Sequence, residues 1–271
     1  MNTSPLAPAA SDEPPIQLII IDQHGMEIVQ RLRACTRLTL AYVFLNSADS
    51  PDGFSQAIHD GPLLFILADA SNPAALQCAR AVGQYARQRN MLSIAPLSYR
   101  NSDWTIDQAL TAAKGMLAQQ VDALLEPCLP PDWLHSAQPA ALLQRVNALA
   151  GDAIYAISSS HCISGLVNLD LHDLRDILAR RKMVKVTAAI GQGAERAEQS
   201  AQSALTTLQL TPAYFSDEIT QFLHFAATPQ LKLSEISAAI TCFEPAIVIV
   251  ASQPGDLPET QLRLTVFAVA Q

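Results

Sequence analysis

From residue 16 onward, short apolar runs rich in β-branched residues alternate with segments whose apolar positions recur every three or four residues. Runs of that length are typical of β-strands, and the longer amphipathic segments have the period of α-helices. In the first half of the chain we expect strands at 16–22, 37–45, 62–68, 91–97 and 121–127. The 62–68 run is apolar almost throughout, as is typical of a parallel strand buried on both faces.

Helices are expected between these strands, at 26–35, at 72–90, between 97 and 121, and in a long apolar stretch at 138–160. Asn72 followed by Pro73 is a favourable helix start, because Asn caps free N–H groups and Pro fits the first turn. The alternation of strands and helices predicts an α/β fold with a doubly wound, Rossmann-like parallel sheet.

The pattern changes in the second half of the chain. A strand at 183–190 and a helix at 194–208 are followed by a second such pair at 219–226 and 233–244, and by two closing strands. This order predicts a smaller α+β domain with a mixed sheet. We therefore divide the chain into a disordered tail (1–14), a Rossmann-like domain (15–137), a central helix (138–163), a loop with its following helix (164–182) and a C-terminal domain (183–271).

Composition narrows the class of protein. Hydrophobic residues make up 49% of the chain and charged residues 15%, which is typical of a globular protein with a large core. The net charge of −8 argues against binding nucleic acid, which needs a surplus of Lys and Arg. We expect no membrane insertion, because no run of 18 apolar residues occurs, and the N-terminus lacks the pattern of a signal peptide. The five widely spaced cysteines predict reduced thiols, a cytoplasmic location and no metal site.

Three motifs carry a resemblance to a known family. The stretch "GLVNLDLHDLRDIL" (165–178) resembles the synergy loop of the bacterial tubulin FtsZ, roughly G-x-x-N-x-D-F-A-D-V. "AAIGQGAERAEQSAQSAL" (188–205) is similar to the FtsZ pattern G-x-G-x-x-x-G-x-x-R-A-x-x-A-A-x-x-A-I, and "QLRLTVFAVA" (261–270) to E-L-R-V-T-V-I-A-T-G. "YVFLNSAD", "GPLLFILADA" and "SIAPLSY" lie where FtsZ has its second, third and fourth strands, so the resemblance covers about 15–271.

The resemblance implies a GTP-binding domain, a long central helix and a C-terminal activation domain. In FtsZ filaments the synergy loop of one subunit inserts over the GTP of the next, and its acids polarise the attacking water. By this resemblance Asp170, Asp173 and Asn168 are candidate catalytic residues acting in trans on a partner's nucleotide. The same acids are also explained as N-terminal caps of a helix, and both interpretations stay open.

The residues at the expected nucleotide pocket depart from the family. The first loop has Gly25 as its only glycine, and the loop 68–75 has none, although phosphate cradles need close backbone approach. That loop instead contains Pro73, which lacks an N–H, and Asp69, whose charge opposes a phosphate. Asn72 with Asp69 forms at most a smaller polar pocket.

Two further parts of the pocket differ. The Arg and Glu expected after the fourth strand are missing from 101–125, and Asn147 is followed by alanine where FtsZ has the Asp that reads guanine. We therefore treat Gly25, Asp69, Asn72 and Asn147 as positions of a degenerate pocket and expect no ordinary binding of GTP and Mg²⁺.

A basic cluster follows the loop. Arg175, Arg180, Arg181 and Lys182 either complement the dipole of a helix end or form a surface for an acidic partner.

These observations favour an FtsZ-like pseudo-GTPase that docks its synergy-type loop on a tubulin-like partner filament, FtsZ itself or a second copy, in bacterial cell division. One alternative is a divergent GTP-binding GTPase that self-assembles. A second is a tubulin-fold scaffold unrelated to nucleotide or division. Because the last expected strand ends at residue 270 of 271, we expect no terminal peptide for recruiting membrane tethers.

Overall fold

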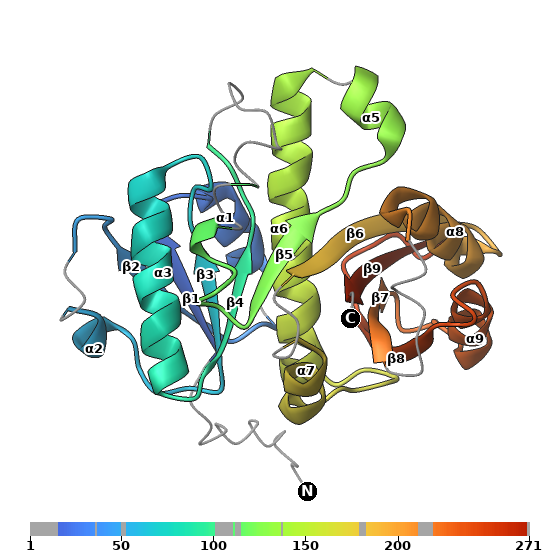
Figure 1. The fold of residues 1–271 in the computed structure, drawn as a ribbon. Coiled ribbons are helices and arrows are strands. Elements are labelled where there is room, and N and C mark those ends of the chain that lie inside the picture. The colour runs from blue at the N-terminus through green and yellow to red at the C-terminus, as the bar shows by residue number, and fades with distance from the viewer. Residues whose placement is uncertain are drawn as a thin grey trace, which may run out of the picture.

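Apolar strands build one nine-stranded sheet in the order β2-β1-β3-β4-β5-β6-β9-β7-β8 (Figure 1). The computed structural model describes residues 16–35, 37–49, 53–100, 111, 115–136, 138–178, 183–210 and 219–269. Most neighbouring strands are parallel, and only β9 runs antiparallel to both of its neighbours, β6 and β7. The expected tail at 1–14 and most of the expected helix between 97 and 121 lie outside the described residues.

The N-terminal half contributes five parallel strands, each close to its expected position. They are β1 (Ile16–Ile21), β2 (Leu40–Leu45), β3 (Leu63–Leu67), β4 (Leu92–Pro96) and β5 (Ala123–Pro127). Every residue of β1, β3 and β4 is buried, as continuous apolar runs require when helices cover both faces of a parallel sheet.

Helices cover both faces of these strands. On one face α1 (Met26–Ala34) packs with the central helix α6 (Pro139–Cys162) in a shared apolar core. On the other face α2 (Phe54–Ala57) and α3 (Pro73–Gln88) pack in a second core, and α5 (Pro131–Ser136) precedes α6. The expected cap is confirmed at α3, because the Asn72 side chain accepts hydrogen bonds from the N–H groups of Ala74 and Ala75.

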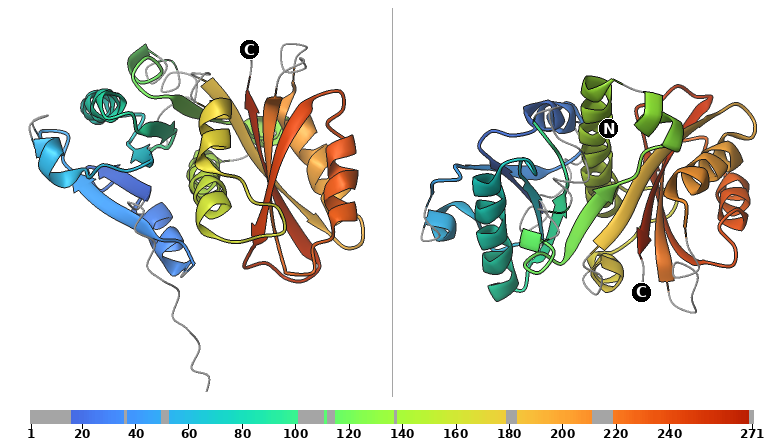
Figure 2. Two further views of the ribbon diagram at one scale, coloured as in Figure 1. Left: turned by 90° about the horizontal axis from the view of Figure 1, so that it is seen from below. Right: turned by 45° about the horizontal axis from the view of Figure 1, so that its top comes forward.

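The C-terminal half adds the remaining four strands and two helices. Its elements are β6 (Met183–Gln192), α8 (Arg196–Leu208), β7 (Ile219–Ala227), α9 (Leu233–Thr241), β8 (Ile247–Pro254) and β9 (Gln261–Val269). Helices α8 and α9 cover one face of these strands. Helix α6 and the short α7 (Leu171–Leu178) lie on the other face, between the two halves (Figure 2).

The expected fold class is confirmed, including the mixed sheet of the C-terminal half. The sequence pattern did not indicate that the two halves share one sheet. Parallel pairing of β5 with β6, from Leu124 with Met183 to Pro127 with Val186, joins them. Helix α6 therefore packs on a continuous sheet. Its N-terminal end lies near the loops after β1 and β4, and its C-terminal end leads into the loop before α7.

Candidate functional site

A cavity of about 480 Å³ opens near the N-terminal end of α6. It is lined by residues 23–28 after β1, by Tyr99 and Arg100 after β4, and by α6 residues between 140 and 148. This is the carboxyl edge of the parallel strands, where ligands bind in open α/β sheets.

The loop after β1 adopts an unusual backbone despite its single glycine. Asp22 and Gln23 have φ of 54° and 55°, and Gly25 has φ of 67°. Positive φ is uncommon for residues other than glycine, and backbone strain of this kind clusters at functional sites. A lack of glycine in the sequence therefore does not by itself remove the left-handed turn at this loop.

His24 lies in this loop with its side chain buried against the loop after β4. Its Nε2 lies 2.8 Å from Ser98 Oγ. Burial lowers the pKa of His24, and the Asp69 carboxylate only partly offsets this, so the imidazole is neutral at pH 7.

Asn147 lies in the wall of the cavity, but its amide is already engaged. Its Oδ1 accepts the N–H of Tyr99 at 2.9 Å, and its Nδ2 donates to Tyr99 O at 2.9 Å and to Glu27 Oε1 at 3.2 Å. The side chain thus fixes the loop after β4 to α6. A base bound here would have to compete with these bonds.

From Ala70 to Ala75 the loop 68–75 has no backbone donor left for a phosphate. Ala70 N–H donates to Ser98 O, Ser71 N–H to the Asp69 carboxylate, and Asn72 N–H to Asp69 O. Pro73 has no N–H, and the next two N–H groups are taken by the Asn72 side chain. Asp69 itself is 5% exposed and accepts further bonds from Ser71 Oγ and from the Arg100 N–H at 3.2 Å. Neither Asp69 nor Asn72 lines the larger cavity.

Sequence reasoning missed Arg100 as a cavity residue. The side chain lines the cavity, and its Nη2 donates to Asp22 O at 2.7 Å. Arg100 lies in the loop three residues after the expected strand at 91–97. A search that counted from the end of the β4 strand would have found it.

The synergy-type loop lies at the opposite end of α6, where the helix ends at Cys162 (Figure 1). Asn147 and Cys162 are separated by roughly 20 Å along the helix axis. The acids of this loop therefore cannot act on a ligand in the cavity of their own molecule.

Two contacts hold this loop on strand β8. Val167 and Ser252 form an antiparallel bridge, in which Ser252 N–H donates to Val167 O at 2.8 Å and Val167 N–H donates to Ser252 Oγ at 3.0 Å. Gly165 packs so closely on Ser252 that any Cβ would overlap the Ser252 carbonyl. Asn168 closes the loop, because its Oδ1 accepts the Gly165 N–H at 2.8 Å.

The two acids of the loop differ in their contacts. Asp170 caps α7, since its Oδ1 accepts the Asp173 N–H at 2.8 Å, and this bond chiefly lowers its pKa. The exposed Asp170 carboxylate is therefore ionised at neutral pH. Asp173 lies in the first turn of α7. The capping interpretation is thus realised for Asp170, and it leaves the acid exposed to a partner.

Of the basic residues after the loop, the structure describes only Arg175. Its guanidinium donates to Asn90 Oδ1 at 3.1 Å and to Asn90 O at 2.9 Å, which ties α7 to the end of α3. Arg180, Arg181 and Lys182 lie outside the described residues.

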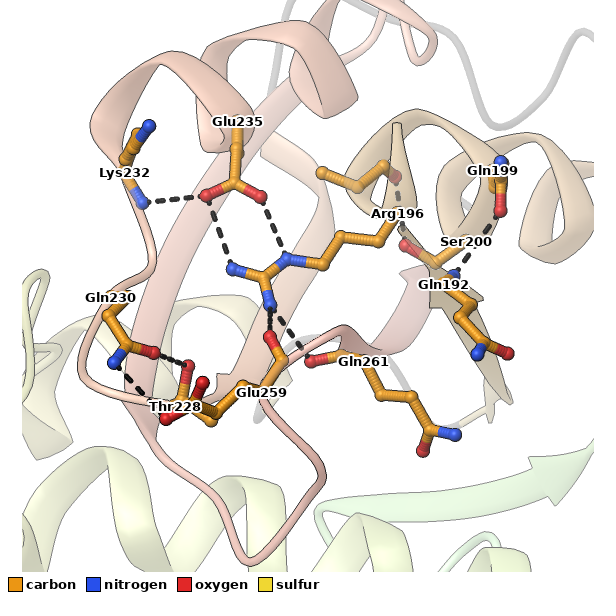
Figure 3. A network of polar contacts seen from close by, with 11 residues as sticks. Gln192, Arg196, Gln199, Ser200, Thr228, Gln230, Lys232, Glu235, Glu259 and Gln261 are labelled. Atoms are coloured by element: carbon orange, nitrogen blue, oxygen red, sulfur yellow. Dashed lines mark hydrogen bonds and ion pairs between the residues drawn. The ribbon is translucent and has the colours of Figure 1, made fainter. Parts of the chain in front are cut away.

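A smaller cavity of about 300 Å³ lies under the synergy-type loop, between residues 164–166, 228–231 and 252–254. Arg196 holds the neighbouring segment, as Figure 3 shows: its Nε donates to Glu235 Oε1 at 2.8 Å and its Nη1 to Glu259 O and Gln261 O. Burial would raise the pKa of Glu235, but the bonds from Arg196 and from Lys232 N–H outweigh it and lower the pKa. The Arg of the "ERA" motif therefore joins the starts of α8 and α9 to the β8–β9 turn.

Other candidate chemistry is weak in the described residues. Within them, no group of three His, Cys, Asp or Glu side chains is arranged to hold a metal ion. Ser159 Oγ lies 3.0 Å from His224 Nε2, but burial lowers the pKa of His224 to about 3, and neither residue lines the two cavities above. No helix in the described part of the chain is long and apolar enough to cross a bilayer.

No protein-family model matches the chain, but sequence comparison finds similar proteins, among them the cell division protein FtsZ of several bacteria. The chain is 22% identical over 234 residues to the cell division protein FtsZ of Neisseria gonorrhoeae, which covers 80% of this chain and 58% of that protein. It is 25% identical over 226 residues to FtsZ of Buchnera aphidicola, with 78% and 58% covered. The chain thus spans less than two thirds of the curated relatives that it matches.

Solved structures agree in fold. An empty FtsZ dimer from M. jannaschii superposes with a TM-score of 0.79 at 14% identity, covering 95% of this chain and 89% of the other. CetZ from Methanosaeta thermophila superposes with a TM-score of 0.63 at 11% identity, covering 94% and 86%. A Rossmann-like half and a mixed C-terminal half joined by one long helix define the tubulin-like class of α/β proteins. The chain therefore has an FtsZ/tubulin-like fold and is distantly similar in sequence to FtsZ.

Proposed function

We propose that this chain is an FtsZ-like pseudo-GTPase of the bacterial cytoplasm that docks its synergy-type loop on the nucleotide face of a tubulin-like partner filament. On this proposal it supplies Asp170 and Asp173 to a partner's GTP and holds no GTP of its own.

One observation carries the proposal: every N–H from Ala70 to Ala75 that exists already has an acceptor within the protein. Binding phosphate there would break several of these bonds and bring a second anion beside the buried Asp69, at a large electrostatic cost. The corresponding loop of a GTPase needs free N–H groups that converge on the anion.

The opposite face supports docking. Its loop is fixed to β8 by the Val167–Ser252 bridge, so it needs little ordering when it binds. The same loop presents Leu166, which is 52% exposed, and the ionised Asp170, four residues further on. An apolar contact together with an ionised carboxylate suits a protein partner with a bound nucleotide and its hydrating water.

The experiment measures GTP turnover by purified FtsZ of the same organism with and without this protein. Asp170→Asn with Asp173→Asn is the test variant, because Asn keeps the helix cap and removes the charge. We expect any stimulation of turnover to fall about a hundredfold, the usual contribution of a general base. Asp176→Asn on the same helix is the matched control. Equal stimulation by the double variant and by wild type would assign the acids to capping alone.

A second candidate function, a divergent GTP-binding GTPase, is favoured by the large cavity. The left-handed turn at Asp22 and Gln23 and the side chains of Glu27 and Arg100 give that cavity polar walls. Calorimetric titration with GTP and GDP in the presence of Mg²⁺ separates the two candidates. Binding at micromolar affinity would reject the pseudo-GTPase, and the absence of heat together with an unchanged Tm would reject the GTPase.

A further inference from the structure

Strand β2 forms the N-terminal edge of the sheet (Figure 1). It pairs with β1 in a regular parallel register of six residue pairs, from Ile16 with Leu40 to Ile21 with Leu45. No other strand of the described chain pairs with its outer side. The opposite edge of the sheet differs, because Val167 bridges Ser252 on β8.

The composition of β2 leaves this edge unprotected. Its six residues, LAYVFL, include no charge and no proline, and the pairing with β1 has no bulge. Edge strands of monomeric proteins are usually protected by charges, prolines or bulges. Phe44 is 45% exposed, and the Arg33 guanidinium lies 4.6 Å from the centroid of the Tyr42 ring and 5.9 Å from that of Phe44. The two rings thus point to the same face of the sheet, with Phe44 exposed and Tyr42 half-buried.

The charges at the two ends of β2 are complementary to each other. Arg37 precedes the strand, Asp49 follows it, and both are exposed. A parallel partner strand would place like charges together. Asp49 lies after a turn, where its Oδ2 accepts the Asn46 N–H at 2.7 Å. An antiparallel copy of the same strand brings the end that carries Arg37 to the end of the other copy that carries Asp49.

We propose that β2 is a homodimer interface, in which the β2 strands of two copies pair antiparallel about a twofold axis at Val43. In that register Tyr42 of each copy lies opposite Phe44 of the other, and Arg37 lies toward Asp49. Aromatic cross-strand pairs and opposite charges are the pairs that stabilise antiparallel sheets. Pairing of the edges makes one sheet that runs through both copies. The surfaces at the two ends of α6 take no part in this interface.

Another occupant of the edge would be residues 1–15 of the same chain. That segment contains Pro5, Pro8, Pro14 and Pro15, which lack the N–H that an added strand must donate. A second copy of β2 has every N–H and no proline. The interface involves neither the synergy-type loop nor the cavity, so it stands or falls independently of the proposed function.

Sedimentation velocity over a wide range of protein concentrations tests the dimer. We expect wild type to shift from monomer to dimer as concentration rises. Phe44→Lys removes the aromatic pair and adds an edge charge, so the dimer dissociation constant should rise about tenfold or more. Ile190→Lys is the matched control, since Ile190 is 52% exposed and lies on β6. A monomer at every concentration, or a dimer that Phe44→Lys leaves unchanged, would overturn the proposal.

Charge exchange tests the register and does not depend on the folding of the Phe44 variant. Arg37→Glu and Asp49→Lys should each weaken the dimer, because each places like charges together. The double variant restores opposite charges and should regain most of the wild-type affinity. If the double variant is as weak as the single ones, the antiparallel register about Val43 is wrong.

Discussion

At the scale of single residues, two glycines of the recognisable motifs are explained by packing. A Cβ at Gly165 would overlap the carbonyl of Ser252, and one at Gly191 would overlap the carbonyl of Arg196. The first glycine lets the synergy-type loop lie on β8, and the second lets β6 approach the start of α8. Both motifs thus preserve close contacts between backbones, which require no nucleotide.

Gly165→Ala should therefore separate the loop from β8. The overlap forces the loop away and weakens the Val167–Ser252 bridge, so we expect the free energy of unfolding to fall by about 2 kcal/mol. Chemical denaturation measures this change. Gly53→Ala is the control, because φ is −71° there and a Cβ would meet no atom within 4 Å. If Gly165→Ala leaves the free energy of unfolding unchanged, the stability of the protein does not depend on the contact between this loop and β8.

The sequence predicted the chemical character of the pocket better than its geometry. It identified Asp69 and Pro73 as unfavourable for phosphate binding, because the charge of a carboxylate and the missing N–H of proline follow from the residue types. It did not reveal that Asp69 is buried by bonds from Ser71 and Arg100, because these depend on how the loops after β3 and β4 meet. Arg100, in contrast, could have been found from the sequence, because it lies three residues after the expected strand at 91–97.

At the scale of elements, periodicity predicted most strands and helices. The contrast between continuous apolar runs and three-to-four-residue spacing is local, so the sequence carries it directly. The pairing of β5 with β6 is not local, because 55 residues separate Pro127 from Met183. The shared sheet therefore could not be predicted from the pattern.

Arg196 joins three elements, and its replacement should loosen all three. Lys keeps the charge but lacks the guanidinium fork, so Arg196→Lys would leave Glu235 and the carbonyls of Glu259 and Gln261 incompletely bonded. We expect a loss of about 2 kcal/mol in the free energy of unfolding. Hydrogen exchange should also show faster opening at residues 228–235.

The matched control for this change is Arg89→Lys. The Arg89–Asp60 pair is solvent-exposed, and such pairs contribute little to stability. Denaturation of the two variants side by side checks the prediction. If the two variants lose equally little stability, a lysine at residue 196 can replace the contacts of the Arg196 guanidinium.

At the scale of the whole molecule, helix α6 separates two unequal faces. The face at its N-terminal end has the larger cavity and the loop 68–75, whose N–H groups from Ala70 to Ala75 are already bonded within the protein. The face at its C-terminal end has a fixed loop and an ionised acid. On the proposed function, the synergy-type loop of this molecule can bind the nucleotide face of the last subunit of a filament. Its own cavity face holds no nucleotide, so no further subunit can bind there.

A chain with one working face should stop growth at one filament end. We therefore expect the protein to shorten filaments of partner FtsZ at ratios far below one copy per subunit, as measured by fluorescence microscopy of single filaments. Asp170→Asn with Asp173→Asn should still shorten filaments, because docking uses the loop surface, but should no longer stimulate GTP turnover. Decoration along the filament sides without shortening would instead favour the scaffold alternative, in which neither face engages a nucleotide.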